Sequence, residues 1–215
     1  MYIYNFIFIS IFGFNSLYAG NVQESREARL SQYTKVTEVQ GVKPEHVTKA
    51  SNGNIYIKNA RVYSGSKESP DGKVSVTTDS NTRKVVLKNV KIYSKNNVSH
   101  TNEATNAVLS IETSANTRVS IENSDIRSQN IELKNSSNEN KVCAGVFCIQ
   151  AEKNSNIVIK NTTITASSTN AVVSSIQNKG KKCAGVFCVQ ADDSDIEISD
   201  TTVSSYGNNN FEIED

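Results

Sequence analysis

Apolar and polar residues alternate in short stretches along most of this chain, and one such stretch recurs. The phrase apolar-x-apolar-x-Asn-x-x-apolar occurs five times, with aspartate in place of asparagine in the last copy. The copies begin at Ile55, Val85, Val119, Ile157 and Ile196, so successive copies are 30, 34, 38 and 39 residues apart. Alternation with a period of two is typical of a strand with one buried face. The spacing predicts a repeat of short strands joined by loops of variable length.

A second alternating phrase precedes four of these copies by nine to eleven residues. It reads Val74-Ser-Val76, Leu109-Ser-Ile111, Phe147-Cys-Ile149 and Phe187-Cys-Val189. A unit of two or three short strands cannot bury its apolar face alone, so its copies must stack on one another. Parallel stacking about 4.8 Å apart places rows of Ile, Val, Leu and Phe along the inside. We therefore expect an all-β fold, a parallel β-helix of about five coils.

The asparagine in each phrase is expected where the chain turns. Asparagine tolerates a left-handed backbone, and its side chain can hydrogen-bond to the equivalent residue of the next coil. We predict an asparagine ladder inside this turn, interrupted in the last coil by Asp200. Its members are Asn59, Asn89, Asn123 and Asn161.

The recurring phrase resembles the repeats of the right-handed parallel β-helix superfamily. That superfamily includes pectate lyases, other polysaccharide-modifying enzymes, phage tailspikes and secreted adhesins. The resemblance covers roughly residues 50–205 and implies a right-handed solenoid. It carries little information on activity, because one fold can support unrelated functions. A two-sheet β-sandwich is the alternative architecture, since it also has short alternating strands.

The N-terminus has the features of a targeting segment. The stretch YIYNFIFISIFGFNSLYAG has no charged residue, and its apolar part is shorter than the roughly 20 residues of a spanning helix. We expect a signal peptide at residues 1–19, although an uncleaved anchor or a misplaced start codon would also fit. Residues 20–50, with a short amphipathic helix, are expected to cap the β-helix of residues 51–215. These features predict a secreted, periplasmic or cell-surface protein with no membrane insertion after signal cleavage.

The four cysteines lie in two nearly identical nonamers, CAGVFCIQA and CAGVFCVQA. An even number of cysteines in an exported chain favours disulfides over metal ligands. We predict the local pairs Cys143–Cys148 and Cys183–Cys188, with Gly145 allowing the bend and with Cys148 and Cys188 facing outward. Vertical pairs between equivalent positions of the two nonamers remain open as the alternative.

Charge excludes one class of partner. The chain has 23 Lys and Arg against 22 Asp and Glu, and this balance argues against non-specific binding of nucleic acid. Its densest acidic run can be interpreted as a calcium site, a carbohydrate-cleaving pair or a solvated turn. The residues of this run are Asp192, Asp193, Asp195 and Glu197.

The resemblance implies different chemistry for enzymes of the superfamily, namely acidic clusters with Arg or Lys and, in galacturonase-like members, a Gly-His-Gly tripeptide. The chain has two histidines and no such tripeptide, so we assign no catalytic residue, metal or other cofactor. Tyr56, Tyr63 and Tyr93 lie in the first two copies and can form a sugar-stacking patch or stand singly on the surface.

These observations favour an exported, non-enzymatic structural or adhesive protein that presents a rigid surface to a glycan or a surface protein. A polysaccharide-active enzyme or its inactive relative is one alternative. A subunit of an extracellular assembly, which self-associates end to end through an uncapped coil, is another.

Overall fold

The computed structural model describes residues 37–95, 98–100, 105–129, 132–134, 142–167, 182–191 and 193–206. They belong to one compact unit, Val36–Asp215. Across these ranges the chain is all-β apart from one short 3-10 helix, η1 (Pro44–His46). Within them, no helix has the length and apolar character needed to cross a membrane. The predicted signal peptide and the amphipathic helix expected after it lie outside the described residues.

The described strands form three large sheets and one small one. Sheet A contains β1 (Glu38–Gln40), β5 (Val74–Thr77), β9 (Thr105–Thr113), β13 (Val142–Ala151) and β16 (Lys182–Ala191). Sheet B contains β2 (Val47–Lys49), β3 (Ile55–Lys58), β6 (Lys84–Lys88), β10 (Arg118–Glu122), β14 (Asn156–Lys160) and β17 (Asp195–Ser199). Sheet C contains β4 (Arg61–Tyr63), β7 (Lys91–Lys95), β11 (Asp125–Gln129), β15 (Thr163–Ser167) and β18 (Thr202–Tyr206). Sheet D pairs β8 (Val98–His100) with β12 (Glu132–Lys134).

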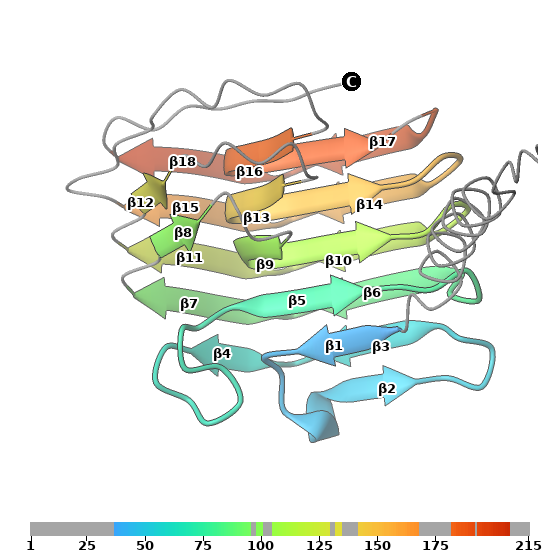
Figure 1. Cartoon of the computed structure of the whole chain (residues 1–215), viewed down its shortest axis with the longest axis horizontal. Coiled ribbons are helices and arrows are strands. Elements are labelled where there is room, and N and C mark those ends of the chain that lie inside the picture. The colour runs from blue at the N-terminus through green and yellow to red at the C-terminus, as the bar shows by residue number, and fades with distance from the viewer. Residues whose placement is uncertain are drawn as a thin grey trace, which may run out of the picture. The chain divides into compact units, whose positions relative to one another are not determined.

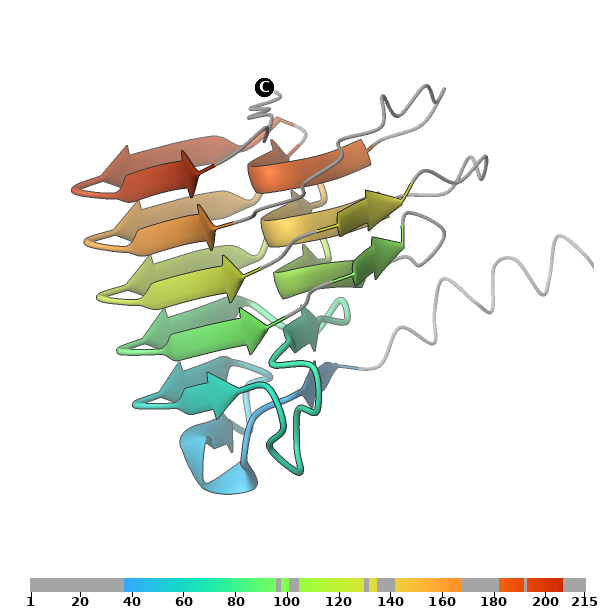
Figure 2. The same ribbon diagram turned by 90° about the vertical axis from the view of Figure 1, so that its left-hand side faces the viewer.

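From β5 onward the chain visits sheets A, B and C in a fixed order and then returns to sheet A, with β8 and β12 of sheet D preceding two of these returns. We call each passage through the three sheets a layer, so that β5, β6 and β7 form one layer and β16, β17 and β18 form the last. Figures 1 and 2 show these layers stacked along one direction. Each copy of the recurring phrase supplies the sheet B and sheet C strands of one layer.

Successive copies pair in parallel and in register. Ile121 lies opposite Leu87 on one side and Ile159 on the other. The second phrase behaves in the same way in sheet A, where Phe147 is opposite Leu109 and Phe187. The predicted all-β class and the parallel pairing of copies are therefore confirmed. An antiparallel β-sandwich does not fit these sheets.

The alternating apolar residues form the core. Ile57, Leu87, Ile121 and Ile159 form one continuous row in sheet B, and none of them is exposed to solvent. Burying each side chain of this size contributes about 1.5–3 kcal/mol. In sheet A the rings of Phe147 and Phe187 stack with centroids 5.1 Å apart. The core is thus a set of rows, each built from one position of the repeat.

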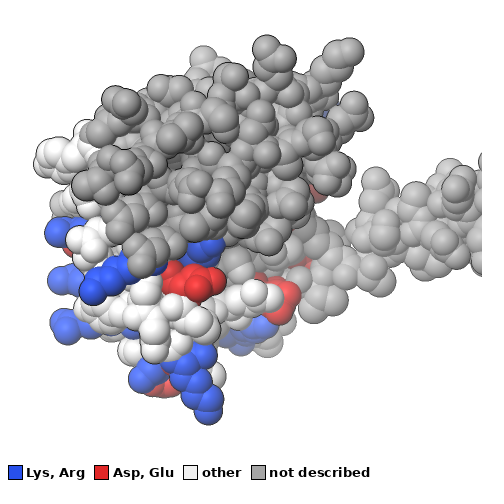
Figure 3. All heavy atoms as spheres, turned by 60° about the vertical axis from the view of Figure 1, so that its left-hand side comes forward, with Lys and Arg blue, Asp and Glu red and all other residues white. Residues whose placement is uncertain are grey.

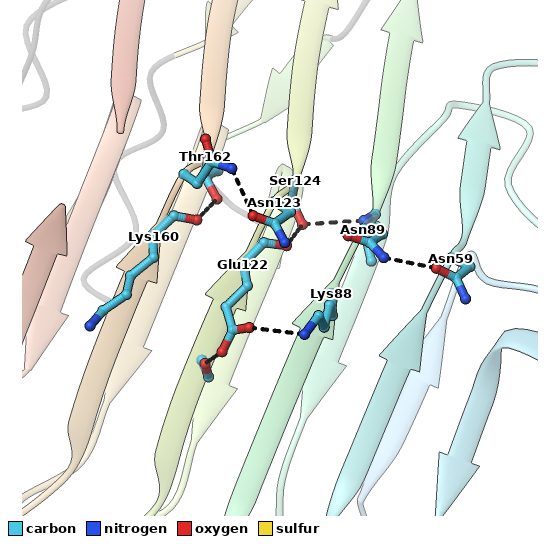
Figure 4. A network of polar contacts seen from close by, with 11 residues as sticks. Asn59, Lys88, Asn89, Glu122, Asn123, Ser124, Lys160 and Thr162 are labelled. Atoms are coloured by element: carbon cyan, nitrogen blue, oxygen red, sulfur yellow. Dashed lines mark hydrogen bonds and ion pairs between the residues drawn. The ribbon is translucent and has the colours of Figure 1, made fainter. Parts of the chain in front are cut away.

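The asparagine turns connect sheet B to sheet C. All four predicted asparagines have a left-handed backbone, with φ between 47° and 55°, and Asp200 has φ 50°. Asn89 donates its side-chain amide to Asn59 at 3.0 Å (Figure 4), and Asn161 donates to Asn123 at 2.7 Å. All four asparagines are exposed, so these side chains lie on the outer surface of the turn. The left-handed residue turns its side chain outward, and the following residue, such as Val90 or Thr162, is buried instead.

A second turn with the same chemistry connects sheet A to sheet B. Asn116, Asn154 and Asp193 have φ of 60°, 57° and 45°. The backbone N–H of Asn116 donates to Lys153 O at 3.0 Å, and that of Asn154 donates to Asp193 O at 3.2 Å. Each is followed by a Ser or Thr, as in the first turn of the later copies. The sheet B strand of these layers is therefore bounded at both ends by an Asn or Asp that can adopt a left-handed conformation.

Residues 38–49 cover the N-terminal end of sheets A and B. β1 pairs antiparallel with β5, and β2 pairs antiparallel with β3. Thr37 anchors the start of this segment, since its hydroxyl accepts from the Asp79 N–H at 3.1 Å and lies 2.9 Å from the Thr82 hydroxyl. Burial raises the pKa of Asp79, but hydrogen bonds from Asn81, Thr37 and Thr82 outweigh it and lower the pKa. The charged carboxylate is thereby favoured in this turn.

Candidate functional site

The outer face of sheet C carries one row of aromatic and basic side chains. Tyr63, Tyr93 and Arg127 come from three successive strands and are opposite one another in register. Parallel strands lie about 4.8 Å apart, so the three side chains form a short, closely spaced line. Tyr63 is 48% exposed, and Arg127 is also exposed. The row continues with the small polar residues Thr165 and Ser204.

Basic side chains flank this row on the same strands. Arg61 and Lys91 lie two residues before the tyrosines, and Lys95 lies two residues after Tyr93. All three are exposed and occupy the same face of the sheet, because side chains two apart in a strand point the same way. Lys and Arg side chains gather along one edge of the described surface on this side of the molecule (Figure 3). We call this surface the sheet C patch: Arg61, Tyr63, Lys91, Tyr93, Lys95 and Arg127.

The arginine of the patch is held in position by a carboxylate on its own strand. Arg127 Nε donates to Asp125 Oδ1 at 2.8 Å. This hydrogen bond, with the attraction between the two charges, raises the pKa of Arg127 further above its ordinary value. Asp125 is the only acidic residue in the three outward-facing rows that carry the patch, among the residues that the structure describes. The patch therefore combines two aromatic rings with a surplus of positive charge.

The structure brings together only two of the three tyrosines that the sequence groups. Tyr56 lies on sheet B, in the outward row with Val86 and Ser120, and the Lys58 ammonium is 5.2 Å from the centre of its ring. The sequence groups the three tyrosines because they lie in the first two copies of the phrase. In the structure, two tyrosines are neighbours only if their strands belong to the same sheet. Arg127 was missed for the same reason. The fourth position after each turn Asn gives Tyr63, Tyr93 and Arg127 in order, so aligning the copies at this position would have found the row.

The acidic run lies in the last layer and does not converge on one point. Asp195 and Glu197 are exposed on the outer face of β17, and Asp193 occupies the turn before it. Glu197 pairs with Lys160 at 2.6 Å, while Asp192 lies outside the described residues. No group of three or more His, Cys, Asp or Glu residues suited to a metal ion occurs in the described part of the chain. The turn geometry at Asp193 favours the interpretation of this run as a turn.

The nonamer cysteines occupy a second, smaller buried cluster. Cys148 and Cys188 alternate with core residues and so face away from the main core, as expected, but neither is exposed to solvent. They pack with Ala107, and β8 of sheet D lies against β9 and β13 nearby. No free cysteine occurs in the described part of the chain. The side chains of Cys143 and Cys183 lie outside the described set, so the choice between local and vertical pairs stays a prediction.

Comparisons with known proteins find no relative of this chain. No family model matches the chain, and neither the curated proteins nor the solved structures contain a match.

Proposed function

We propose that this chain is an exported, right-handed parallel β-helix that acts as a non-enzymatic binding scaffold, with the sheet C patch as its binding face. The fixed order of sheets A, B and C supports the helical architecture, as the resemblance of the repeats does. Stacked layers joined by tight turns give a stiff surface, and a stiff surface loses little conformational entropy on binding. A secreted, periplasmic or cell-surface location follows from the N-terminal segment and is part of the proposal.

The ligand class that fits the patch best is an acidic glycan. Tyrosine rings offer flat apolar faces to sugar rings, and the arginine and lysine side chains offer charge-assisted hydrogen bonds to carboxylate or sulfate groups. The row Tyr63–Tyr93–Arg127 is the observation that carries this proposal, because it places both kinds of contact on one line.

Binding rather than cleavage is proposed because of the carboxylates. Most glycosidases use a pair of Asp or Glu side chains on either side of the scissile bond. In the described rows of the patch Asp125 is the only carboxylate, and Arg127 already engages it. The acidic residues of the last layer lie on β17 and in the turns on either side of it, outside these three rows.

Titration of the mature protein with acidic and neutral oligosaccharides tests this function. Tyr63→Ala, Tyr93→Ala and Arg127→Ala are each expected to weaken binding of the acidic ligand by about 5- to 30-fold, the loss of roughly 1–2 kcal/mol. Tyr206→Ala is the matched control, because Tyr206 is 66% exposed but lies on β18 at the far end of the sheet. Equal affinities for all four variants would refute the assignment of the sheet C patch.

A further inference from the structure

The last layer leaves the core uncovered at one end. Ile196 and Ile198 continue the rows of Ile157 and Ile159, which are fully buried. Ile196 is nevertheless 36% exposed and Ile198 is 42% exposed. Among the described residues, β17 is paired on one side only, with β14. This end therefore offers both an unpaired strand edge and an apolar surface.

The opposite end is different, because the chain covers it with its own residues. Ile55 and Ile57 hold the same positions in the first copy and are fully buried. β2 occupies the free edge of β3, and β1 occupies that of β5. The fold thus carries a cap at its N-terminal end, whereas the described part of the last layer has none.

The last layer also differs in charge from the layer on which it stacks. Four positions that are neutral in the layer below are acidic here. The pairs are Asn154 and Asp193, Asn156 and Asp195, Val158 and Glu197, and Asn161 and Asp200. Between Asp193 and Tyr206 there is no Lys or Arg. The exposed end of the core is therefore bordered by carboxylates, which accept hydrogen bonds but cannot donate them.

We propose that the last layer binds an extended, basic segment of a partner protein, which adds as a strand to the edge of β17. Apolar residues of that segment would cover Ile196 and Ile198. Its alternating Lys or Arg residues would pair with Asp195 and would share Glu197 with Lys160, which lies 2.6 Å from it. Addition of a strand to an exposed sheet edge is an established mode of peptide recognition. This surface is distinct from the sheet C patch, so the inference does not rest on the proposed glycan binding.

Charge decides between the candidate occupants. The C-terminal residues of the chain include Glu212, Glu214 and Asp215, which would be repelled by the carboxylates of the last layer. Two copies that met through their last layers would oppose the same carboxylates. Stacking of this end on the N-terminal end of another copy would meet the cap formed by β1 and β2. A basic partner has none of these conflicts.

The chain itself supplies a suitable probe. Residues 83–95, RKVVLKNVKIYSK, combine apolar and basic residues and contain no acidic residue. In the fold they form β6 and β7, which pair in register with β10 and β11 of the next layer. A synthetic peptide of this sequence is expected to bind the full protein with an affinity that falls as salt rises. A peptide of residues 195–206, which is acidic, is the matched control and should not bind.

Two variants locate the binding. The first variant replaces the four carboxylates together. It should lower the affinity for the basic peptide about tenfold or more. Its substitutions are Asp193→Asn, Asp195→Asn, Glu197→Gln and Asp200→Asn. The second variant, Ile198→Lys, should also lower the affinity for the basic peptide. This variant should stay folded, because the side chain of Ile198 is already partly exposed. Tyr63→Ala should leave peptide binding unchanged. Absence of binding, equal binding by either variant, or concentration-dependent self-association that blocks the peptide would overturn the proposal.

Discussion

Single asparagines set the direction of the chain at each turn. Asn161 combines φ 47° with a 2.7 Å hydrogen bond to Asn123, so its side chain and its backbone both matter. Asn161→Ala should lower the free energy of unfolding by about 1–2 kcal/mol, since alanine loses the bond and is strained at positive φ. Urea unfolding measures this loss.

Glycine separates the two causes. Asn161→Gly loses the same hydrogen bond but adopts positive φ without strain, so it should cost less than Asn161→Ala. If the alanine and glycine variants were equally stable, backbone strain would have no part in selecting asparagine at this turn.

A second residue-scale prediction concerns Glu122. The Ser120 hydroxyl donates to its Oε1 at 2.9 Å and Lys88 lies 3.6 Å from its Oε2, and together they lower the pKa of Glu122 below its ordinary value. A carboxyl whose pKa is lower in the folded state stabilises the fold above its ordinary pKa, and that contribution disappears as pH falls through the folded-state value.

Glu122→Gln should therefore lose less stability than the wild type between about pH 5 and pH 3. Ser120→Ala should show an intermediate pH dependence, because the hydrogen bond from Ser120 is the largest cause of the shift. Urea unfolding at several pH values measures these slopes. Identical slopes in all three proteins would show that Glu122 does not contribute.

At this scale, residue type predicted the left-handed turns but not which way the side chains point. Asparagine is the residue that best tolerates positive φ after glycine, so the turn could be read directly from the repeat. Exposure of Asn123 and burial of Ser124 depend on how the turn passes between two sheets, which no local pattern encodes.

The contribution of a strand to the free energy of unfolding depends on its position in the stack. Ile121 and Ile198 occupy the same row of sheet B, but Ile121 is fully buried between two layers and Ile198 is 42% exposed. Ile121→Ala should lower the free energy of unfolding by about 2–5 kcal/mol, because it leaves a cavity in the packed core. Ile198→Ala should cost less than about 1 kcal/mol, because much of that side chain already contacts water.

Chemical denaturation of the two variants provides the comparison. Similar losses for both would mean that the last layer is covered in solution, and this would also weaken the inference drawn from its exposed edge. A loss confined to Ile121→Ala is the outcome that the stack predicts.

Strand pairing was largely predictable, because five copies of one phrase can bury their apolar residues only against one another. The position of Arg127 beside Tyr93 was not found in this way, although the same register fixes it. The antiparallel strands β1 and β2 do not contain the recurring phrase, so the repeat could not predict them.

The described part of residues 36–215 is a stack with two unequal ends and one basic, aromatic side. The repeat builds the stack, and departures from the repeat distinguish its surfaces: antiparallel strands at the first end, carboxylates at the last, and the sheet C patch between them. Residues far apart in sequence become neighbours only through the register of the layers. The proposed binding function depends on that register.

Nuclear magnetic resonance spectroscopy of the protein during titration with an acidic oligosaccharide tests this dependence most directly. The account predicts that the backbone amide signals of Tyr63, Tyr93 and Arg127 shift together and with one dissociation constant, although these residues lie 30 and 34 residues apart in the chain. Shifts confined to one continuous segment, or to the outer face of another sheet, would contradict it.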